Sequence, residues 1–167
     1  MAAKSNALQV SPQDLVITRV YDAPRALVFR AWTEPEQLKH WWAPDHCTAP
    51  YVTVDLRSGG KFHHCIRSPD GKEYWGMGVY REIVVPERLV YLDGMADAQG
   101  NPVTPSQYGM SAEFPPETLV TVTFAEEGAR TRVTLHQTLP GEFPERRAME
   151  EGWREMLTRL STQLPRA

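Results

Sequence analysis

The sequence has few cysteines and no long apolar run. Two cysteines, Cys47 and Cys65, among 167 residues are too few for a disulfide framework, so we expect two reduced thiols. No stretch approaches the roughly 18 apolar residues that a membrane span needs. The opening residues MAAKSNALQVSPQD also lack the apolar core of a signal peptide. We therefore expect a soluble, cytoplasmic protein with no membrane span.

An excess of basic charge is also absent. The 18 Lys and Arg residues are outnumbered by 21 Asp and Glu residues, which gives a net charge of -3 at pH 7. This balance offers no broad attraction to a phosphate backbone, and the one dense basic pair, Arg146 and Arg147, lies among glutamates. We expect no nucleic-acid partner.

Several catalytic motifs are missing as well. The sequence contains no GxSxG elbow, no phosphate-binding glycine loop and no His-Glu helix motif, which argues against the usual hydrolase, nucleotide-binding and metalloprotease classes. The stretch His63-His64-Cys65 contains good zinc ligands. However, neighbouring side chains of a strand point to opposite faces, so the two histidines cannot share one ion. We expect no metal site and no cofactor.

The length and the 41% content of hydrophobic residues suit a single domain with a sizeable core. Residues 1–13 are polar and aperiodic, which predicts a flexible leader before one domain at 14–165. A strand at 14–22 is followed by helical spacing, with Pro24 and Pro35 at the expected first turns of two short helices.

Extended segments follow, separated by short turns rich in Gly, Pro and Asp, as in an antiparallel meander. The last segment, 143–164, has apolar residues at steps of three and four and predicts one long amphipathic helix. The 24 residues from 94 to 117 have four prolines and no sustained period, and loops of this length often act as lids. The predicted strands are 51–57, 61–67, 73–84, 88–93, 118–124 and 131–138.

This order predicts an α+β fold in which the sheet curls around the C-terminal helix, because that helix is the one long apolar stripe able to cover a sheet face. Bulky aromatic and methionine side chains fill space less regularly than Leu and Val, so we expect a cavity between the helix and the sheet. Gly152 in the helix and Gly76 and Gly78 in a strand also leave room, although a β-bulge would explain the strand glycines equally well.

Six segments, taken in order, resemble a known group of proteins. They are ITRVYDAPRALVFRAWTEPEQLKHWW, DLRSGGKFH, SPDGKEYWGMGVYREIVVPERLVYLD, TLVTVTF, TRVTLHQTL and EEGWREMLTRLSTQL. The chain is similar to the helix-grip proteins of the SRPBCC (START and birch-pollen-allergen-like) superfamily. Within it, the chain resembles the bacterial stand-alone branch that is similar to the C-terminal domain of the activator of heat-shock-protein-90 ATPase. The resemblance implies a hydrophobic ligand cavity but no single activity.

The adjacent indoles of Trp41 and Trp42 follow the second short helix. Consecutive helical residues point about 100° apart, so one indole can fill the core while the other faces the cavity mouth. Which indole faces the cavity is left open, and both can serve packing alone. The predicted cavity lining comprises Trp41, Trp42, His64, Trp75, Met77, Tyr80, Tyr91, Met110, Phe114, Met149, Trp153 and Met156.

The candidates for proton transfer in this cavity are His64, Tyr80, Tyr91 and Asp93. A hydrogen-bonded structural role for His64 and packing roles for the tyrosines are the simpler interpretations. Asp93, Glu82 and Arg67 could anchor a ligand or form salt bridges at the rim. His136 is expected to point outward into solvent.

Three functions are compatible with these features. The first is binding of a small hydrophobic or aromatic molecule, such as a lipid or polyketide. The second is a cyclase, isomerase or hydrolase acting on such a molecule, and the third is a co-chaperone-like interaction module. The third is disfavoured. The eukaryotic activators join this domain to a separate N-terminal domain, and the short segment before the first predicted strand cannot supply one. The sequence does not decide homodimerisation.

Overall fold

The computed structural model describes residues 10–164. Most of the leader predicted at 1–13, and the last residue of the predicted domain, lie outside the described residues. Within the described part, no helix is long and apolar enough to cross a membrane.

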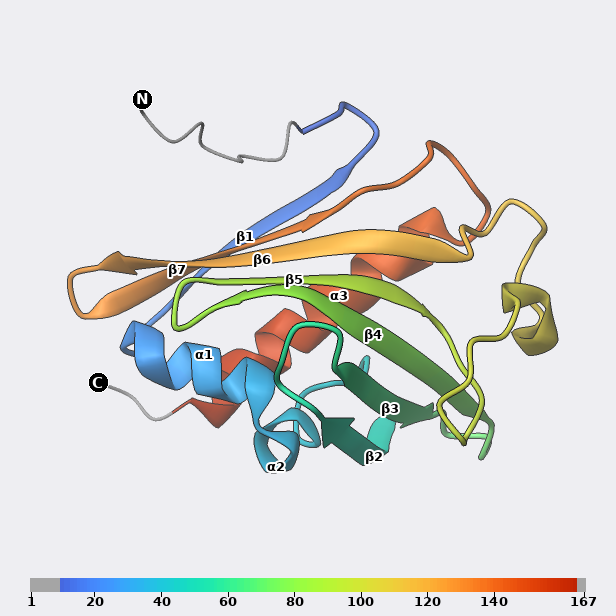
Figure 1. The fold of residues 1–167 in the computed structure, drawn as a ribbon, viewed down its shortest axis with the longest axis horizontal. Coiled ribbons are helices and arrows are strands. Elements are labelled where there is room, and N and C mark those ends of the chain that lie inside the picture. The colour runs from blue at the N-terminus through green and yellow to red at the C-terminus, as the bar shows by residue number, and fades with distance from the viewer. Residues whose placement is uncertain (1–9, 165–167) are drawn as a thin grey trace.

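Seven strands form one antiparallel sheet in the order β1-β7-β6-β5-β4-β3-β2. The sheet curves around the C-terminal helix α3, which crosses it diagonally in Figure 1. This arrangement confirms the predicted α+β helix-grip fold. The strands are β1 (Leu15–Tyr21), β2 (Thr48–Val54), β3 (Lys61–Arg67), β4 (Glu73–Val84), β5 (Arg88–Met95), β6 (Glu117–Glu127) and β7 (Arg130–Gln137).

Two short helices follow β1 and lie together at one end of the sheet (Figure 1). They are α1 (Arg25–Thr33) and α2 (Pro35–Leu38), and the long helix α3 spans Arg146–Gln163. Pro24 is the N-cap of α1 and Pro35 opens α2, as the sequence predicted, because a proline loses no hydrogen bond in a first turn.

The concave face of the sheet carries the core. Helix α3 buries Trp153, Met156, Leu157 and Leu160. Side chains alternate in β3 and in the first part of β4, so that His64, Gly76 and Gly78 face α3 while His63, Trp75 and Met77 face the other way. The β-bulge of β4 lies between Tyr80 and Glu82, so the two glycines do not mark it.

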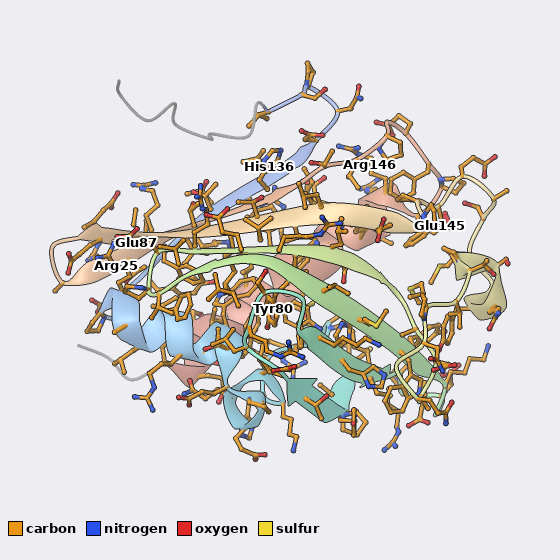
Figure 2. The ribbon with its side chains drawn as sticks, viewed as in Figure 1. Arg25, Tyr80, Glu87, His136, Glu145 and Arg146 are labelled. Carbon is orange, nitrogen blue, oxygen red and sulfur yellow. The ribbon has the colours of Figure 1, made fainter. Side chains whose placement is uncertain are left out.

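His136 on β7 corrects one prediction. It points to the convex face, as the alternation with Val133 and Leu135 requires, but only 8% of it is exposed. Asp14 covers the ring, with its Oδ2 atom 2.8 Å from Nε2 of His136, and the other carboxylate oxygen accepts a hydrogen bond from the backbone N–H of Leu139. Figure 2 shows His136 beside the start of β1. The segment before β1 therefore shields a histidine that the strand pattern alone assigned to solvent.

Candidate functional site

A cavity of about 230 Å³ lies where the first half of α3 faces strands β3, β5 and β7. The space is open to solvent on one side, and its volume exceeds the about 150 Å³ of an enclosed engineered cavity that holds benzene, so a single-ring molecule with a short substituent matches it in size. It is smaller than the roughly 300–1,000 Å³ of most drug-sized sites. The lining residues are Trp42, Pro44, His64, Ile66, Asp93, Gln137, Ala148, Met149, Gly152, Trp153 and Met156.

The two adjacent indoles have different environments. Trp41 is fully buried and donates its Nε1–H to the carbonyl of Ala31 at 3.0 Å, on the side of the core away from the cavity. Trp42 lines the cavity and makes edge contacts with Trp153 and His64, with ring centroids 5.4 and 5.5 Å apart. Trp41 therefore holds the turn after α2 in place, and Trp42 forms a wall of the cavity.

His64 lies in the wall of the cavity and is only 7% exposed. Neither ring nitrogen has a hydrogen-bond partner in the structure, so the expected hydrogen-bonded structural histidine is not what is found. Burial lowers the pKa of His64 to about 3, with a smaller contribution from His63. At neutral pH the imidazole is uncharged and offers one N–H donor and one nitrogen acceptor.

The position of His64 depends on Gly76 of the neighbouring strand. A Cβ atom built on Gly76 would lie 2.4 Å from Cε1 of His64, far inside van der Waals contact. In the same way, a Cβ atom on Gly78 would lie 2.8 Å from Cδ2 of Tyr91. The two glycines give space for side chains of the adjacent strands, rather than space for a ligand directly.

Asp93 of β5 is the second titratable group that lines the cavity. Burial raises the pKa of Asp93 to about 7, and no donor or cation of the described chain offsets this effect. Asp93 pairs with Gly78 on one side and Thr118 on the other in the sheet. It is therefore half-buried on the concave face and keeps its proton far more readily than an exposed carboxyl would.

Gln137 completes the polar floor. It donates from Nε2 to Oγ1 of Thr118 at 2.9 Å and accepts from Nε1 of Trp153 at 3.1 Å. These bonds fix the indole of Trp153 against the sheet. The sequence analysis did not select Gln137, although its alternation with Val133 and Leu135 was a usable signal that it faces inward.

Tyr80 and Tyr91 face the concave side but do not line the cavity. Their rings pack edge to face with centroids 6.2 Å apart, and both side chains are buried in the core. Tyr80 lies well inside the fold in Figure 2. Burial raises the pKa of both hydroxyls above the usual range, with a smaller effect of Asp93 on Tyr91. Neither tyrosine lines the cavity, and Tyr91 lies near Asp93 in the core behind it.

Trp75 and Met77 lie on the convex face and cannot line the cavity. Trp75 packs with Tyr51 and His63, at centroid distances of 5.2 and 5.0 Å. The prediction counted large side chains on β4 without assigning their faces, and odd-numbered residues in this part of β4 point away from α3.

The predicted lid region 94–117 is largely ordered by its own contacts. It contains the end of β5, an isolated bridge between Ala96 and Pro102, and a 3-10 helix at Pro105–Tyr108. Met110 and Phe114 do not line the cavity. Phe114 packs edge to face against Phe143, with centroids 5.7 Å apart.

The same region is tied to the start of α3. Glu145, its N-cap residue, accepts hydrogen bonds from the backbone N–H and the hydroxyl of Ser111 at 2.8 and 2.6 Å. Figure 2 places Glu145 beside this loop. The segment braces the helix end instead of lying over the cavity.

Pro44 and Gly152 of α3 are neighbouring lining residues of the cavity. A Cβ atom on Gly152 would lie 3.7 Å from Cγ of Pro44, an ordinary contact. Nη1 of Arg159 binds the turn that carries Pro44, at 2.6, 3.2 and 3.2 Å from the carbonyl oxygens of Ala43, Pro44 and Cys47. This side of the mouth is therefore fastened to the helix.

The other polar candidates form salt bridges outside the cavity. Arg67 pairs with Glu73 at 2.8 Å, and Arg88 pairs with Glu82. Cys47 and Cys65 are free thiols, and Cys65 donates to Glu73 at 3.7 Å. Of the three residues considered as polar anchors, only Asp93 remains in contact with the cavity.

Larger recesses of about 240 to 380 Å³ occur at the surface, among them one at the turn after β2 and one between α1, α2 and the end of α3. Their described lining contains none of the buried side-chain nitrogen or oxygen atoms that lack a partner. The cavity beside α3 is lined by His64, whose Nδ1 and Nε2 atoms are both buried and unpaired. Buried polar groups are normally satisfied, so this cavity is the candidate site.

A curved antiparallel sheet that grips a C-terminal helix, with a cavity between them, defines a helix-grip protein of the SRPBCC superfamily. The chain belongs to the family described as "Activator of Hsp90 ATPase homolog 1-like protein", whose model matches residues 22–164. A comparison with curated proteins found no match.

Several solved structures are similar to this one. A protein from Arthrobacter aurescens, solved by NMR, is 30% identical with a TM-score of 0.76, covering 90% of this chain and 85% of that one. A crystal structure from Nitrosomonas europaea is 25% identical with a TM-score of 0.74, covering 93% and 96%. A protein from Mycobacterium smegmatis is 28% identical with a TM-score of 0.72, covering 90% and 87%. The family resemblance stated from the sequence is thus confirmed.

Proposed function

We propose that the protein binds a small apolar or aromatic molecule in the cavity between α3 and the sheet. The observation that carries this proposal is His64, a buried imidazole in the cavity wall with both nitrogens unpaired. An unpaired buried polar group costs on the order of 1–3 kcal/mol. Both nitrogens are closed off from solvent in the unliganded protein, so a bound molecule would offset that cost if a small turn of the ring brought one of them to the cavity.

The walls suit such a guest. The indoles of Trp42 and Trp153 and the thioethers of Met149 and Met156 supply apolar, polarisable surface. Small-molecule sites commonly combine a mainly apolar lining with a few placed polar groups, which fix the orientation of the ligand. Here His64 and Asp93 would take that second role.

The test is a binding screen read by tryptophan fluorescence, because two of the five tryptophans line the cavity. Single-ring aromatic compounds and short-chain lipids form the panel. The variant Gly152→Leu places a side chain at the rim and is expected to abolish binding. Thr162→Leu, at an exposed position of the same helix, is the matched control and is expected to keep it. Absence of any binder to the folded wild-type protein would contradict the proposal.

A second candidate function is catalysis on the bound molecule, favoured by the presence of both His64 and Asp93 in one cavity. A carboxyl group with a pKa of about 7 exchanges protons readily at neutral pH, and a neutral imidazole can hydrogen-bond a reacting oxygen. Any compound that binds is incubated with the protein and recovered for mass spectrometry and NMR. A rearranged or hydrolysed product that Asp93→Asn fails to form would support catalysis, and unchanged recovery would support binding alone.

A further inference from the structure

Asp93 is a half-buried carboxyl group whose negative charge no cation of residues 10–164 balances. Burial alone shifts its pKa, with no hydrogen bond and no cation of the described chain opposing that shift. The residues of α3 that line the cavity are Ala148, Met149, Gly152, Trp153 and Met156, and none of them carries a charge.

The other elements around the cavity supply no cation either. Strand β3 contributes His64, which is neutral at ordinary pH because burial lowers its pKa to about 3. Strand β7 contributes the uncharged Gln137, and the turn after α2 contributes Trp42 and Pro44. Tyr91, the neighbouring titratable group on β5, stays protonated because burial raises its pKa.

We propose that the ligand of this cavity is an organic ammonium ion, with its charged nitrogen against Asp93 and a ring-sized apolar body between Trp42 and Trp153. This inference rests on the proposed small-molecule binding and names its chemical class. The ammonium group donates hydrogen bonds to the carboxylate and supplies the missing counter-charge. Indole rings attract cations as well as apolar groups, so the same walls suit both parts of the ligand.

The competing ligand classes fit the site less well. An anionic ligand meets no positive group in the described lining and would be repelled by ionised Asp93. A neutral alcohol of the same shape can hydrogen-bond to His64 or Asp93, but it leaves the charge of the carboxylate unbalanced. The three classes therefore differ in affinity and in its dependence on pH.

The sign of the pH dependence follows from the state of Asp93 that each ligand needs. An ammonium ion binds the ionised carboxylate, so its affinity rises as Asp93 loses its proton. With a pKa of about 7, the ionised fraction grows about tenfold between pH 6 and pH 8.5. A carboxylate ligand needs protonated Asp93 and loses affinity over the same range, while an alcohol changes little.

The experiment compares phenethylamine, 2-phenylethanol and phenylacetate, which share one ring and differ in the polar end. Affinities are measured by calorimetry at pH 6 and pH 8.5. Phenethylamine is expected to bind most tightly at pH 8.5 and to gain about tenfold in affinity from pH 6. Asp93→Asn is expected to remove both effects, and Asp22→Asn, an exposed carboxylate outside the cavity lining, is expected to keep them.

Equal or tighter binding of the alcohol or the carboxylate at pH 8.5 would overturn the inference and leave the proposed function intact. Failure of all three probes to bind the folded protein at millimolar concentration would overturn it together with single-ring binding. If Asp93→Asn does not fold, the pH dependence of the three wild-type affinities still tests the inference. Only an ammonium ligand gains affinity as the pH rises.

Discussion

Replacing Gly152 with alanine should stabilise the protein and weaken ligand binding at the same time. Glycine inside a helix costs about 0.8–1.0 kcal/mol relative to alanine. The added Cβ atom would lie 3.7 Å from Cγ of Pro44 and meet no other atom from outside its own helix turn within 4 Å, so no strain offsets the gain. We expect Gly152→Ala to raise the free energy of unfolding by about 1 kcal/mol, equivalent to a rise of about 2–4 °C in Tm at this chain length.

The same substitution at Gly76 should have the opposite effect and serves as the matched control. There the Cβ atom would lie 2.4 Å from Cε1 of His64, whose ring is held by Trp42 and Phe62. Overpacking a core typically costs about 1–3 kcal/mol, so Gly76→Ala should lower stability by that amount. Opposite effects on stability would show that Gly152 leaves the cavity open, whereas Gly76 makes room for the side chain of His64.

The assay is urea unfolding followed by far-UV circular dichroism, with Tm from calorimetry as a second measure. Wild type, Gly152→Ala and Gly76→Ala are compared at one pH, and any compound that binds the wild type is titrated into each. A less stable Gly152→Ala would show that the glycine meets a structural need, and would refute the view that it is retained for cavity space.

Three further outcomes are expected from single substitutions. Burial raises the pKa of Asp14, but hydrogen bonds from His136 and the backbone lower it by more, so the net shift is downward. Asp14→Asn should therefore cost about 1.5–3 kcal/mol at pH 7, and the difference from wild type should shrink in urea titrations as the pH falls below 4. Because burial raises the pKa of Asp93, the unliganded wild type should lose stability as the pH rises from 4 through 7, and Asp93→Asn should show a flatter profile. Trp153→Phe removes the donor to Gln137, 3.1 Å away, and should cost about 1–3 kcal/mol, with equal stability counting against that bond.

The fold was predictable because its signals are local and periodic. Apolar residues at helical steps in 143–164 and alternating residues in 61–67 and 73–84 gave elements close to those observed. The first and last residues of the strands were less predictable. The strand predicted at 51–57 lies at Thr48–Val54, because residues 55–60 form the turn. A hydrogen bond from Asp55 to Lys61 closes that turn, and the bonds of Gly59 and Gly60 with Tyr80 fix its position through a strand about 20 residues further along the chain.

The cavity was only partly predictable for a physical reason. Strand alternation placed His64 inward, and applying it to β4 would have placed Trp75 outward. No local pattern shows that Asp93 has no partner among residues 10–164 while Glu82 has Arg88, because that depends on side chains brought together by the sheet. Likewise, the exposure of His136 depended on Asp14, which is 122 residues away in the chain.

The bonds of Arg159 to three carbonyl oxygens bear on how a guest would enter. They hold the turn that carries Pro44 against α3. Moving that turn away from the helix would break several charge-assisted contacts together. A guest that entered beside Pro44 would therefore meet a boundary whose position α3 sets when the chain folds, before any encounter takes place.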